Sequence, residues 1–354
     1  MRLDRRRTNQ LALLAGSLMT AGALLIALPF VSQSFDKRAV APSRFASVTS
    51  AAQPAAPAAT AQPSSALDQP AATPPEQGHA SATSTVATAG PGLNAYRGLG
   101  TWVDLYDSNA WKQPGAAVAD MARHGVRTLF LETSNSGWPS AVNQPSTLST
   151  FIQQAHSRGM RIVAWYLPSL TNASKDASRV AQAIAFRTPD GQGFDSFALD
   201  IESSAVRSVK ARNAVVTSLS SGIRSLVGTS YPLGAIIPSP TGIAEKRGYW
   251  NAFPYSALAR DYDVFLPMSY YTYHGNGGKA AYADTVSDVR ILRAQHGCSA
   301  KPIHLIGGLV QGSSAAEAHA FVRAVVKTKC AGASLYDWVG TTKAQWHELG
   351  AIAP

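Results

Sequence analysis

The sequence predicts an α/β fold, a (β/α)8 barrel (TIM barrel), preceded by an N-terminal transmembrane helix and a disordered linker. Eight apolar, β-rich runs alternate with segments of helical periodicity between residues 98 and 338. This is the order and the size of eight strand–helix units. No glycine-rich phosphate loop follows the first run, which argues against the alternative, a doubly wound open sheet.

Residues 1–38 are predicted to form a cytoplasmic, arginine-rich tip and a membrane anchor. Four arginines at positions 2, 5, 6 and 7 precede an uncharged apolar run, residues 11–31. Such a run is about long enough to cross a bilayer, and the preceding arginines predict that the remainder is exported. A cleaved signal peptide is the alternative. We therefore expect a single-pass cell-membrane protein with an extracytoplasmic C-terminal domain, or a secreted protein if the segment is cleaved.

Residues 39–92 consist mainly of Ala, Pro, Ser, Thr and Gln, with almost no large apolar side chains. Such a segment cannot bury enough apolar surface to fold, so it is predicted to be a disordered spacer. The barrel is assigned to residues 93–354. The formal net charge of the chain is +10, but without a long basic run it favours contact with an anionic envelope over nucleic acid. A monomer is expected.

The predicted strands are the apolar runs, and the predicted helices are the segments between them with apolar residues at helical spacing. The strands are residues 98–104, 127–132, 161–167, 196–202, 232–238, 263–271, 302–309 and 333–338. The helices are residues 116–124, 148–158, 177–187, 206–227, 255–261, 282–295 and 315–329. Gly125, Gly159 and Gly297 stand where a helix C-cap is expected.

The two cysteines, Cys298 and Cys330, come shortly before the seventh and eighth strands. In a barrel these strands are neighbours, so both thiols are expected near the same amino-terminal rim. In an exported chain this arrangement predicts a structural disulfide. Two unpaired buried thiols are the alternative.

Carboxylates and aromatic residues dominate the predicted carboxyl ends of the strands, which meet at one mouth of a barrel. The candidate residues are Asp104, Glu132, Trp165, Tyr166, Asp200, Glu202, Met268, Tyr270, Tyr271, Gln311, Tyr336, Asp337 and Trp338. Aromatic faces stack on sugar rings, and carboxylates act on glycosidic bonds. The sequence therefore predicts a carbohydrate site. It contains neither a histidine-rich metal motif nor a G-x-S-x-G nucleophile elbow, and no metal or cofactor is expected.

Asp200 and Glu202 are the strongest candidates. Because side chains alternate along a strand, both lie on the same face as Ala198, while Leu199 and Ile201 lie on the other. Two adjacent carboxyl groups resist ionisation together, which raises a pKa and keeps an acid protonated near neutrality.

Several candidates also have simpler interpretations. Asp104 or Asp337 could cap the following helix, and Glu132 could pair with an arginine. The aromatic residues could simply pack the top of the barrel. These alternatives remain open from the sequence.

The segment from Phe194 to Glu202, FDSFALDIE, resembles the fourth-strand D-x-x-D-x-D-x-E signature of family 18 glycoside hydrolases, the chitinase-like barrels. The resemblance implies that Glu202 is the general acid and that Asp200 orients the substrate's N-acetyl group. The segment PMSYYTYHG resembles that family's M-x-Y-D segment and places Tyr270 at the tyrosine that steadies this group. The chain departs from the family at Ala198 and Tyr271, where the family has aspartates.

The D-x-E pair is also similar to that of family 25 lysozyme-like barrels. The resemblances imply a glycoside hydrolase that acts on an amino-sugar polymer, either peptidoglycan or a chitin-like glycan. A non-catalytic carbohydrate-binding barrel is the second interpretation, which the two departures favour. A scaffold for protein contacts at the envelope is the third.

Overall fold

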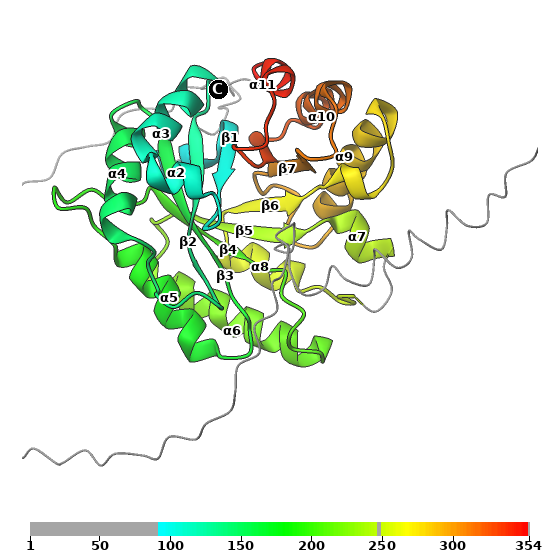
Figure 1. The fold of residues 1–354 in the computed structure, drawn as a ribbon. Helices are drawn as coiled ribbons and strands as arrows, with labels where there is room; N and C mark the ends of the chain where they lie inside the picture. Colours follow the sequence, from blue (N-terminus) through cyan, green and yellow to red (C-terminus); the bar gives the residue numbers. More distant parts are fainter. Residues whose placement is uncertain (1–90, 246–248, 353–354) are drawn as a thin grey trace, which may run out of the picture. The chain divides into compact units, whose positions relative to one another are not determined.

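Eight parallel strands form a closed barrel in this protein, which was analysed as a computed structural model (Figure 1). The structure describes residues 91–245 and 249–352. Each strand pairs with the next along the chain, and β1 also pairs with β8, which closes the ring. The strands are β1 (Gly98–Val103), β2 (Thr128–Asn135), β3 (Arg161–Leu167), β4 (Ser196–Asp200), β5 (Leu233–Pro238), β6 (Val264–Met268), β7 (His304–Leu309) and β8 (Gly332–Tyr336). The barrel predicted from the sequence is confirmed, and the open sheet is excluded.

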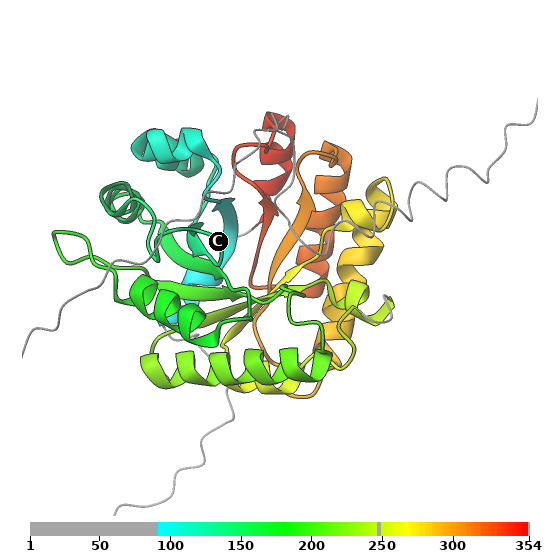
Figure 2. The same ribbon diagram turned by 60° about the horizontal axis from the view of Figure 1, so that its bottom comes forward.

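Helices surround the barrel and cover the outer faces of its strands (Figure 2). The α-helices are α2 (Ser108–Lys112), α3 (Pro114–Arg123), α4 (Pro145–His156), α5 (Ala173–Ala185), α6 (Val209–Val227), α7 (Pro240–Glu245), α8 (Tyr255–Asp261), α9 (Gly278–Arg293), α10 (Ala315–Thr328) and α11 (Lys343–Leu349). Two short 3-10 helices are η1 (Pro91–Tyr96) and η2 (Tyr271–Tyr273).

The predicted strands and helices agree with the observed ones to within a few residues at most ends. Gly125, Gly159 and Gly297 have φ angles of 79°, 69° and 81°, as expected of C-cap glycines. Three helices were missed, α2, α7 and α11, because each is too short to show a repeated apolar period. The predicted strand 263–271 was too long, because the chain turns into η2 soon after Met268.

Alternating residues of each strand divide between two apolar clusters. On β4, Phe197 and Leu199 pack outward against the helices, whereas Ala198 belongs to the cluster inside the barrel. The inner cluster also contains Trp102 and Phe130, whose rings are stacked with centroids 4.3 Å apart. This alternation determines which residues at the strand ends can reach the mouth.

Tyr96 closes the amino end of the barrel. Its hydroxyl lies 2.5 Å from Ser196 Oγ and donates to the carbonyl of Phe197 at 3.2 Å. The Tyr96 carbonyl is 3.0 Å from Nδ1 of the buried His304. Since a carbonyl can only accept, Nδ1 carries the proton, and Nε2 accepts from the hydroxyl of Ser334 at 3.1 Å. Burial lowers the pKa of His304 to about 4, so this histidine is neutral.

The predicted disulfide is wrong, because Cys298 and Cys330 are both free thiols. The Cys298 Sγ is buried and contacts the carbonyls of Tyr255 and His296, each at 3.9 Å. The Cys330 Sγ instead lies 3.3 Å from Thr328 Oγ1, at the end of α10. Each thiol is directed at its own local partners, so similar positions before neighbouring strands did not bring the two sulfur atoms together.

The expected membrane segment, residues 11–31, lies outside the described residues, as do residues 39–90 of the expected linker. Within residues 91–245 and 249–352, no helix has the length and apolar character needed to cross a bilayer.

Candidate functional site

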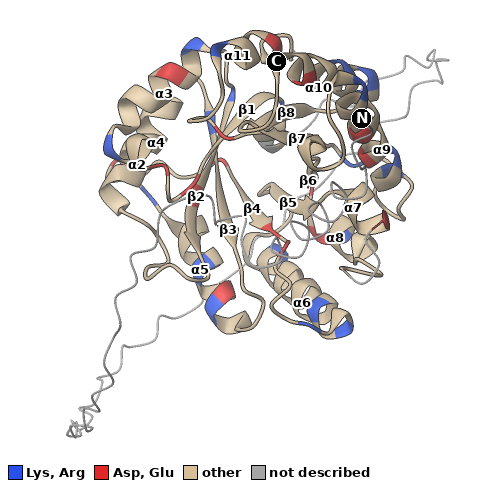
Figure 3. Ribbon diagram, turned by 45° about the vertical axis from the view of Figure 1, so that its right-hand side comes forward, with Lys and Arg blue, Asp and Glu red and all other residues tan. Residues whose placement is uncertain are grey.

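Acidic side chains converge at the carboxyl end of the barrel. Glu132 lies on β2, Asp104 directly follows β1, Asp200 is the last residue of β4, and Glu202 is the second residue after β4. Acidic segments near the ends of β2 and β4 lie inside the ring of helices, whereas most Lys and Arg lie on the helices around it (Figure 3). The site is therefore acidic although the chain has a net positive charge of +10.

Asp200 and Glu202 form the centre of this site. Asp200 is only 7% exposed, and its Oδ1 has no hydrogen-bond partner in the described part of the chain. Burial and the charges of Glu202 and Glu132 raise the pKa of Asp200 well above its usual range. Burial also raises the pKa of Glu202 to about 7. The pair therefore holds a proton near neutrality, as a general acid must.

Glu132 is completely buried beside this pair. Its Oε2 accepts from the backbone N–H of Leu105 at 3.0 Å, and its Oε1 accepts from Asn135 Nδ2 at 3.2 Å. Burial, together with the charges of Asp104 and Glu202, raises its pKa to about 8. No arginine forms an ion pair with it within the described residues. Glu132 is therefore a second protonated acid at the site.

Asp104 links the first strand of the barrel, β1, to the last, β8. Its Oδ2 accepts a hydrogen bond of 2.8 Å from the Tyr336 hydroxyl, and its Oδ1 accepts from the backbone N–H groups of Tyr106 and Asp107. It thus caps the turn before α2 and also holds an aromatic side chain at the mouth. Burial and the Asp104 charge raise the pKa of Tyr336 well above its usual range.

Aromatic residues line the site next to the carboxyl groups. Tyr270 packs against the inner cluster, and burial and the charges of Glu202 and Asp200 raise its pKa well above the usual range. Trp165 and Met268 belong to the inner cluster, and Trp165 Nε1 has no hydrogen-bond partner in the described structure. A buried donor and a buried acceptor, Trp165 Nε1 and Asp200 Oδ1, are thus both unsatisfied, which a polar ligand would remedy.

Four of the predicted mouth residues are engaged elsewhere. Tyr166 points outward and donates to Asp176 at 2.6 Å, and the Tyr271 hydroxyl lies 2.8 Å from Ser313 Oγ in the outer layer. Trp338 donates to Asp120 of α3, and Gln311 is exposed.

Asp337 remains at the site. Burial, together with the charges of Asp104 and Asp107, raises its pKa to about 6, and its own charge contributes to the raised pKa of Tyr270. Its Oδ1 accepts from the Gly340 N–H within a turn. The capping interpretation of Asp337 is wrong, because the N-cap of the following helix, α11, is Thr342.

Four further residues at the site were not identified from the sequence. Asn135 bonds Glu132, and the Tyr249 hydroxyl donates to the Glu202 carbonyl at 3.4 Å. The Tyr273 ring meets the Tyr270 ring edge-on at 5.9 Å, and the half-exposed Tyr106 meets Trp138 at 5.7 Å. Tyr106 and Tyr273 lie close in sequence to Asp104 and Tyr270, which was the available signal. Tyr249 comes from a loop that carries no motif.

No group of three or more His, Cys, Asp or Glu in the described part of the chain is arranged to hold a metal ion. Two cavities lie away from the strand ends: one is on the outer helices and one is at the amino end of the barrel.

This arrangement is a (β/α)8 barrel with carboxyl groups at the carboxyl ends of its strands, and solved glycoside hydrolase structures share its fold. No known protein family and no curated protein matches the sequence.

Among solved structures, a chitinase from Bacteroides thetaiotaomicron is similar with a TM-score of 0.53 and 12% identity, over 72% of this chain and 95% of that one. An endo-beta-1,4-mannanase from Thermotoga petrophila has a TM-score of 0.52 and 13% identity, over 69% of this chain and 68% of that one. An endo-1,4-beta-mannanase from Rhizomucor miehei has a TM-score of 0.51 and 12% identity, over 68% of this chain and 86% of that one. At these identities the similarity defines the fold alone.

Proposed function

We propose that this protein is a glycoside hydrolase that acts on an amino-sugar polymer, either peptidoglycan or a chitin-like glycan. The observation that carries the proposal is the Asp200–Glu202 pair at the carboxyl end of β4, in which Asp200 is buried, Glu202 is partly exposed and the Glu202 pKa is raised to about 7. A carboxylic acid that stays protonated near neutrality can donate a proton to a glycosidic oxygen.

In the proposed reaction, Glu202 protonates the leaving-group oxygen as the bond to the anomeric carbon breaks. Asp200, whose Oδ1 has no partner in the described structure, accepts a hydrogen bond from the substrate's acetamido N–H. The acetamido carbonyl then attacks the anomeric carbon, and the Tyr270 hydroxyl donates to that group. Water completes hydrolysis with Glu202 acting as the base, which restores its proton.

A non-catalytic carbohydrate-binding barrel is the second candidate function. The observation in its favour concerns the side chains at the two positions where the chain departs from the family signature. Ala198 offers no carboxyl group inside the barrel below Asp200, and Tyr271 points away from the site. A barrel with this site would still present Trp165, Tyr270 and Tyr336 to a sugar.

The proposal places the barrel outside the cytoplasm, held to the membrane or secreted. It is supported by the arginines before the apolar run of residues 11–31 and by the Ala/Pro-rich composition of residues 39–92. Fractionation of the native host, with N-terminal sequencing of the mature protein, distinguishes an anchored form from a secreted one.

Turnover and binding must be measured on the same glycans to separate the two candidate functions. The wild type and Glu202→Gln are incubated with chito-oligosaccharides and with peptidoglycan fragments, and products are quantified by mass spectrometry. The hydrolase proposal requires turnover by the wild type that is lost in the variant while binding persists. Binding without turnover in both proteins would select the carbohydrate-binding barrel.

A further inference from the structure

A basic cavity opens at the amino end of the barrel, on the side opposite the acidic site. It has a volume of about 650 Å³ and is lined by residues that come just before β1, β7 and β8 and by the end of α9. We call it the basal pocket. Four of its lining residues are cationic, Arg97, Arg293, Lys301 and Lys329, and none of the lining residues is acidic.

The positive charge of the basal pocket is not neutralised by the protein. None of the four cations forms an ion pair with a described residue. Lys301 donates to the carbonyl of Tyr262 at 2.7 Å, which fixes its position and leaves its charge unopposed. Arg293 lies close enough to Cys330 for its charge to lower that thiol's pKa against the larger, raising effect of burial.

Lys329 occupies a backbone conformation that usually requires glycine. It is the C-cap of α10, with φ 54° and ψ 45°, in the left-handed region. Glycine is the common residue at this kind of position because a side chain is strained there. A lysine at this position therefore has a cost that a glycine would avoid, and this lysine is one of the residues that line the basal pocket.

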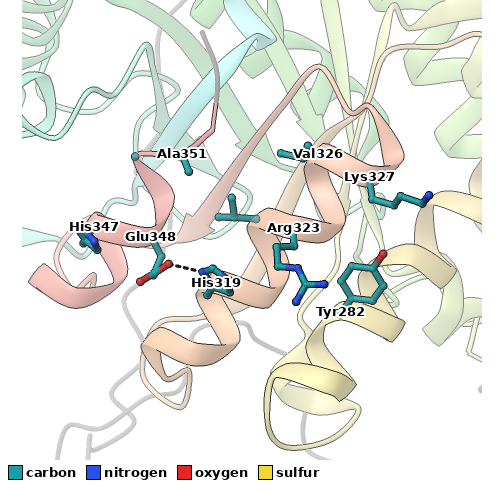
Figure 4. Close-up of a pocket in the computed structure, with 10 residues that line it drawn as sticks. Tyr282, His319, Arg323, Val326, Lys327, His347, Glu348 and Ala351 are labelled. Carbon is teal, nitrogen blue, oxygen red and sulfur yellow. Dashed lines mark hydrogen bonds and ion pairs between the residues drawn. The ribbon is translucent and has the colours of Figure 1, made fainter.

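In the other cavity, the basic side chains of His319 and Arg323 each have a partner (Figure 4). This cavity lies over α9, α10 and α11, and there Glu348 bonds His319 at 2.7 Å. Arg323 lies over the ring of Tyr282, with its guanidinium carbon 5.7 Å from the ring centroid. The lining of this cavity includes an acid and an aromatic partner, whereas the lining of the basal pocket includes neither.

We propose that the basal pocket binds a phosphate-bearing anion. Guanidinium and ammonium groups together are suited to a tetrahedral oxyanion, since arginine offers paired donors and lysine a compact charge. A volume of about 650 Å³ is within the range of small-molecule sites. The bound phosphate belongs either to a small phosphorylated molecule or to a polymer with many phosphate charges. The site is separate from the acidic mouth and does not depend on the proposed hydrolase activity.

Calorimetric titration of the purified protein with inorganic phosphate, tripolyphosphate and a long polyphosphate chain tests this proposal. One saturable site is expected. Arg293→Gln should weaken tripolyphosphate binding about tenfold, since a hydrogen bond to a charged group is lost. Binding of the single phosphate as tightly as the chain would identify a small ligand, and much tighter binding of the chain would identify a polymer.

Two further variants test whether a loss of binding is caused by unfolding or by a general loss of surface charge. Lys329→Gly removes a charge and relieves the strained backbone, so it should weaken binding about fivefold while the melting temperature stays the same or rises. Arg323→Gln, in the cavity over the outer helices, is the matched control and should leave binding unchanged. The proposal is overturned if no saturable binding occurs, if Lys329→Gly binds as tightly as the wild type, or if Arg323→Gln weakens binding equally.

Discussion

Tyr270 and Tyr271 are consecutive in the chain and lie on opposite sides of the barrel wall. Tyr270 packs against the inner cluster beside Asp200 and Glu202, whereas Tyr271 is buried in the outer core with its hydroxyl 2.8 Å from Ser313 Oγ. The same chemical change at these two positions therefore separates a contribution to the site from a contribution to stability.

Tyr270→Phe should lower kcat/KM by about five- to thirtyfold, the equivalent of one hydrogen bond of roughly 1–2 kcal/mol, with an unchanged melting temperature. Tyr271→Phe should do the reverse: it should cost about 1 kcal/mol of unfolding free energy and leave kcat/KM as it was. Steady-state kinetics and urea denaturation measure both quantities. Equal kinetic losses in the two variants would contradict the assignment of Tyr270 to the site.

Glu202→Gln should reduce kcat by about 10²–10⁴-fold with little change in KM, because the amide keeps the shape of the side chain and cannot donate a catalytic proton. Glu348→Gln, on the outer helix α11, is the control and should retain wild-type rates. Turnover unaffected by Glu202→Gln would move the acid to another carboxyl group, of which Glu132 is the nearest candidate by charge interaction.

The pH dependence of turnover should follow the ionisation of Glu202. Glu202 must be protonated to act as the acid, so kcat should fall as the pH rises through its pKa of about 7. Burial raises this pKa, whereas the charge of Glu202 raises the pKa of Asp200 further, so Asp200 keeps its proton while Glu202 ionises. Asp200→Asn should therefore leave the alkaline limb in place, and the residual activity of the variant, followed from pH 4 to 9, provides the measurement. A limb that moves to lower pH would mean that Asp200 is ionised beside Glu202.

Glu132 should make the barrel less stable as the pH rises. Its pKa is raised from 4.5 to about 8 in the folded protein, so the folded state binds more protons than the unfolded state between these values. The stabilisation is complete below pH 4.5, amounts to roughly 5 kcal/mol, and is lost progressively as the pH rises from 4.5 through 8. In Glu132→Gln, the unfolding free energy measured in urea should fall less steeply over this range. An unchanged slope would mean that Glu132 is already ionised at pH 5.

Both cysteines should be recovered as free thiols. Thiol-specific alkylation under non-reducing conditions, followed by peptide mapping, should label Cys330 before Cys298, because Cys298 is fully buried and Cys330 is partly exposed. Reduction should leave the melting temperature unchanged. A linked pair of peptides in the non-reduced map would restore the disulfide predicted from the sequence.

The architecture could be predicted from the sequence because each strand–helix unit carries a local signal. Apolar runs and C-cap glycines mark the units independently, and their number alone implies closure. Short elements such as α7 could not be found this way, because six residues do not reveal a period. The relative positions of the two cysteine sulfur atoms could not be predicted either, because they depend on where side chains point in loops.

The site was predicted in part, and the error has a simple physical origin. Two adjacent residues of a strand cannot both face the inside of a barrel, so Trp165 and Tyr166 were mutually exclusive as mouth residues. Strict alternation from Ala198 selects Asp200 and Glu202, and alternation from Trp165 rejects Tyr166. The contact between Tyr249 and Glu202 could not be foreseen, because it joins a loop to the site across a long stretch of sequence.

The position of Tyr96 at the amino end of the barrel determines where the fold resists a pulling force. The chain enters the barrel through η1, and Tyr96 ties that entry to β4 through Ser196 and to β7 through His304. A pull on the preceding residues is therefore resisted at the amino end, by these hydrogen bonds. The carboxyl groups lie at the opposite end of the barrel, so a force applied to the residues before η1 would not act on them directly.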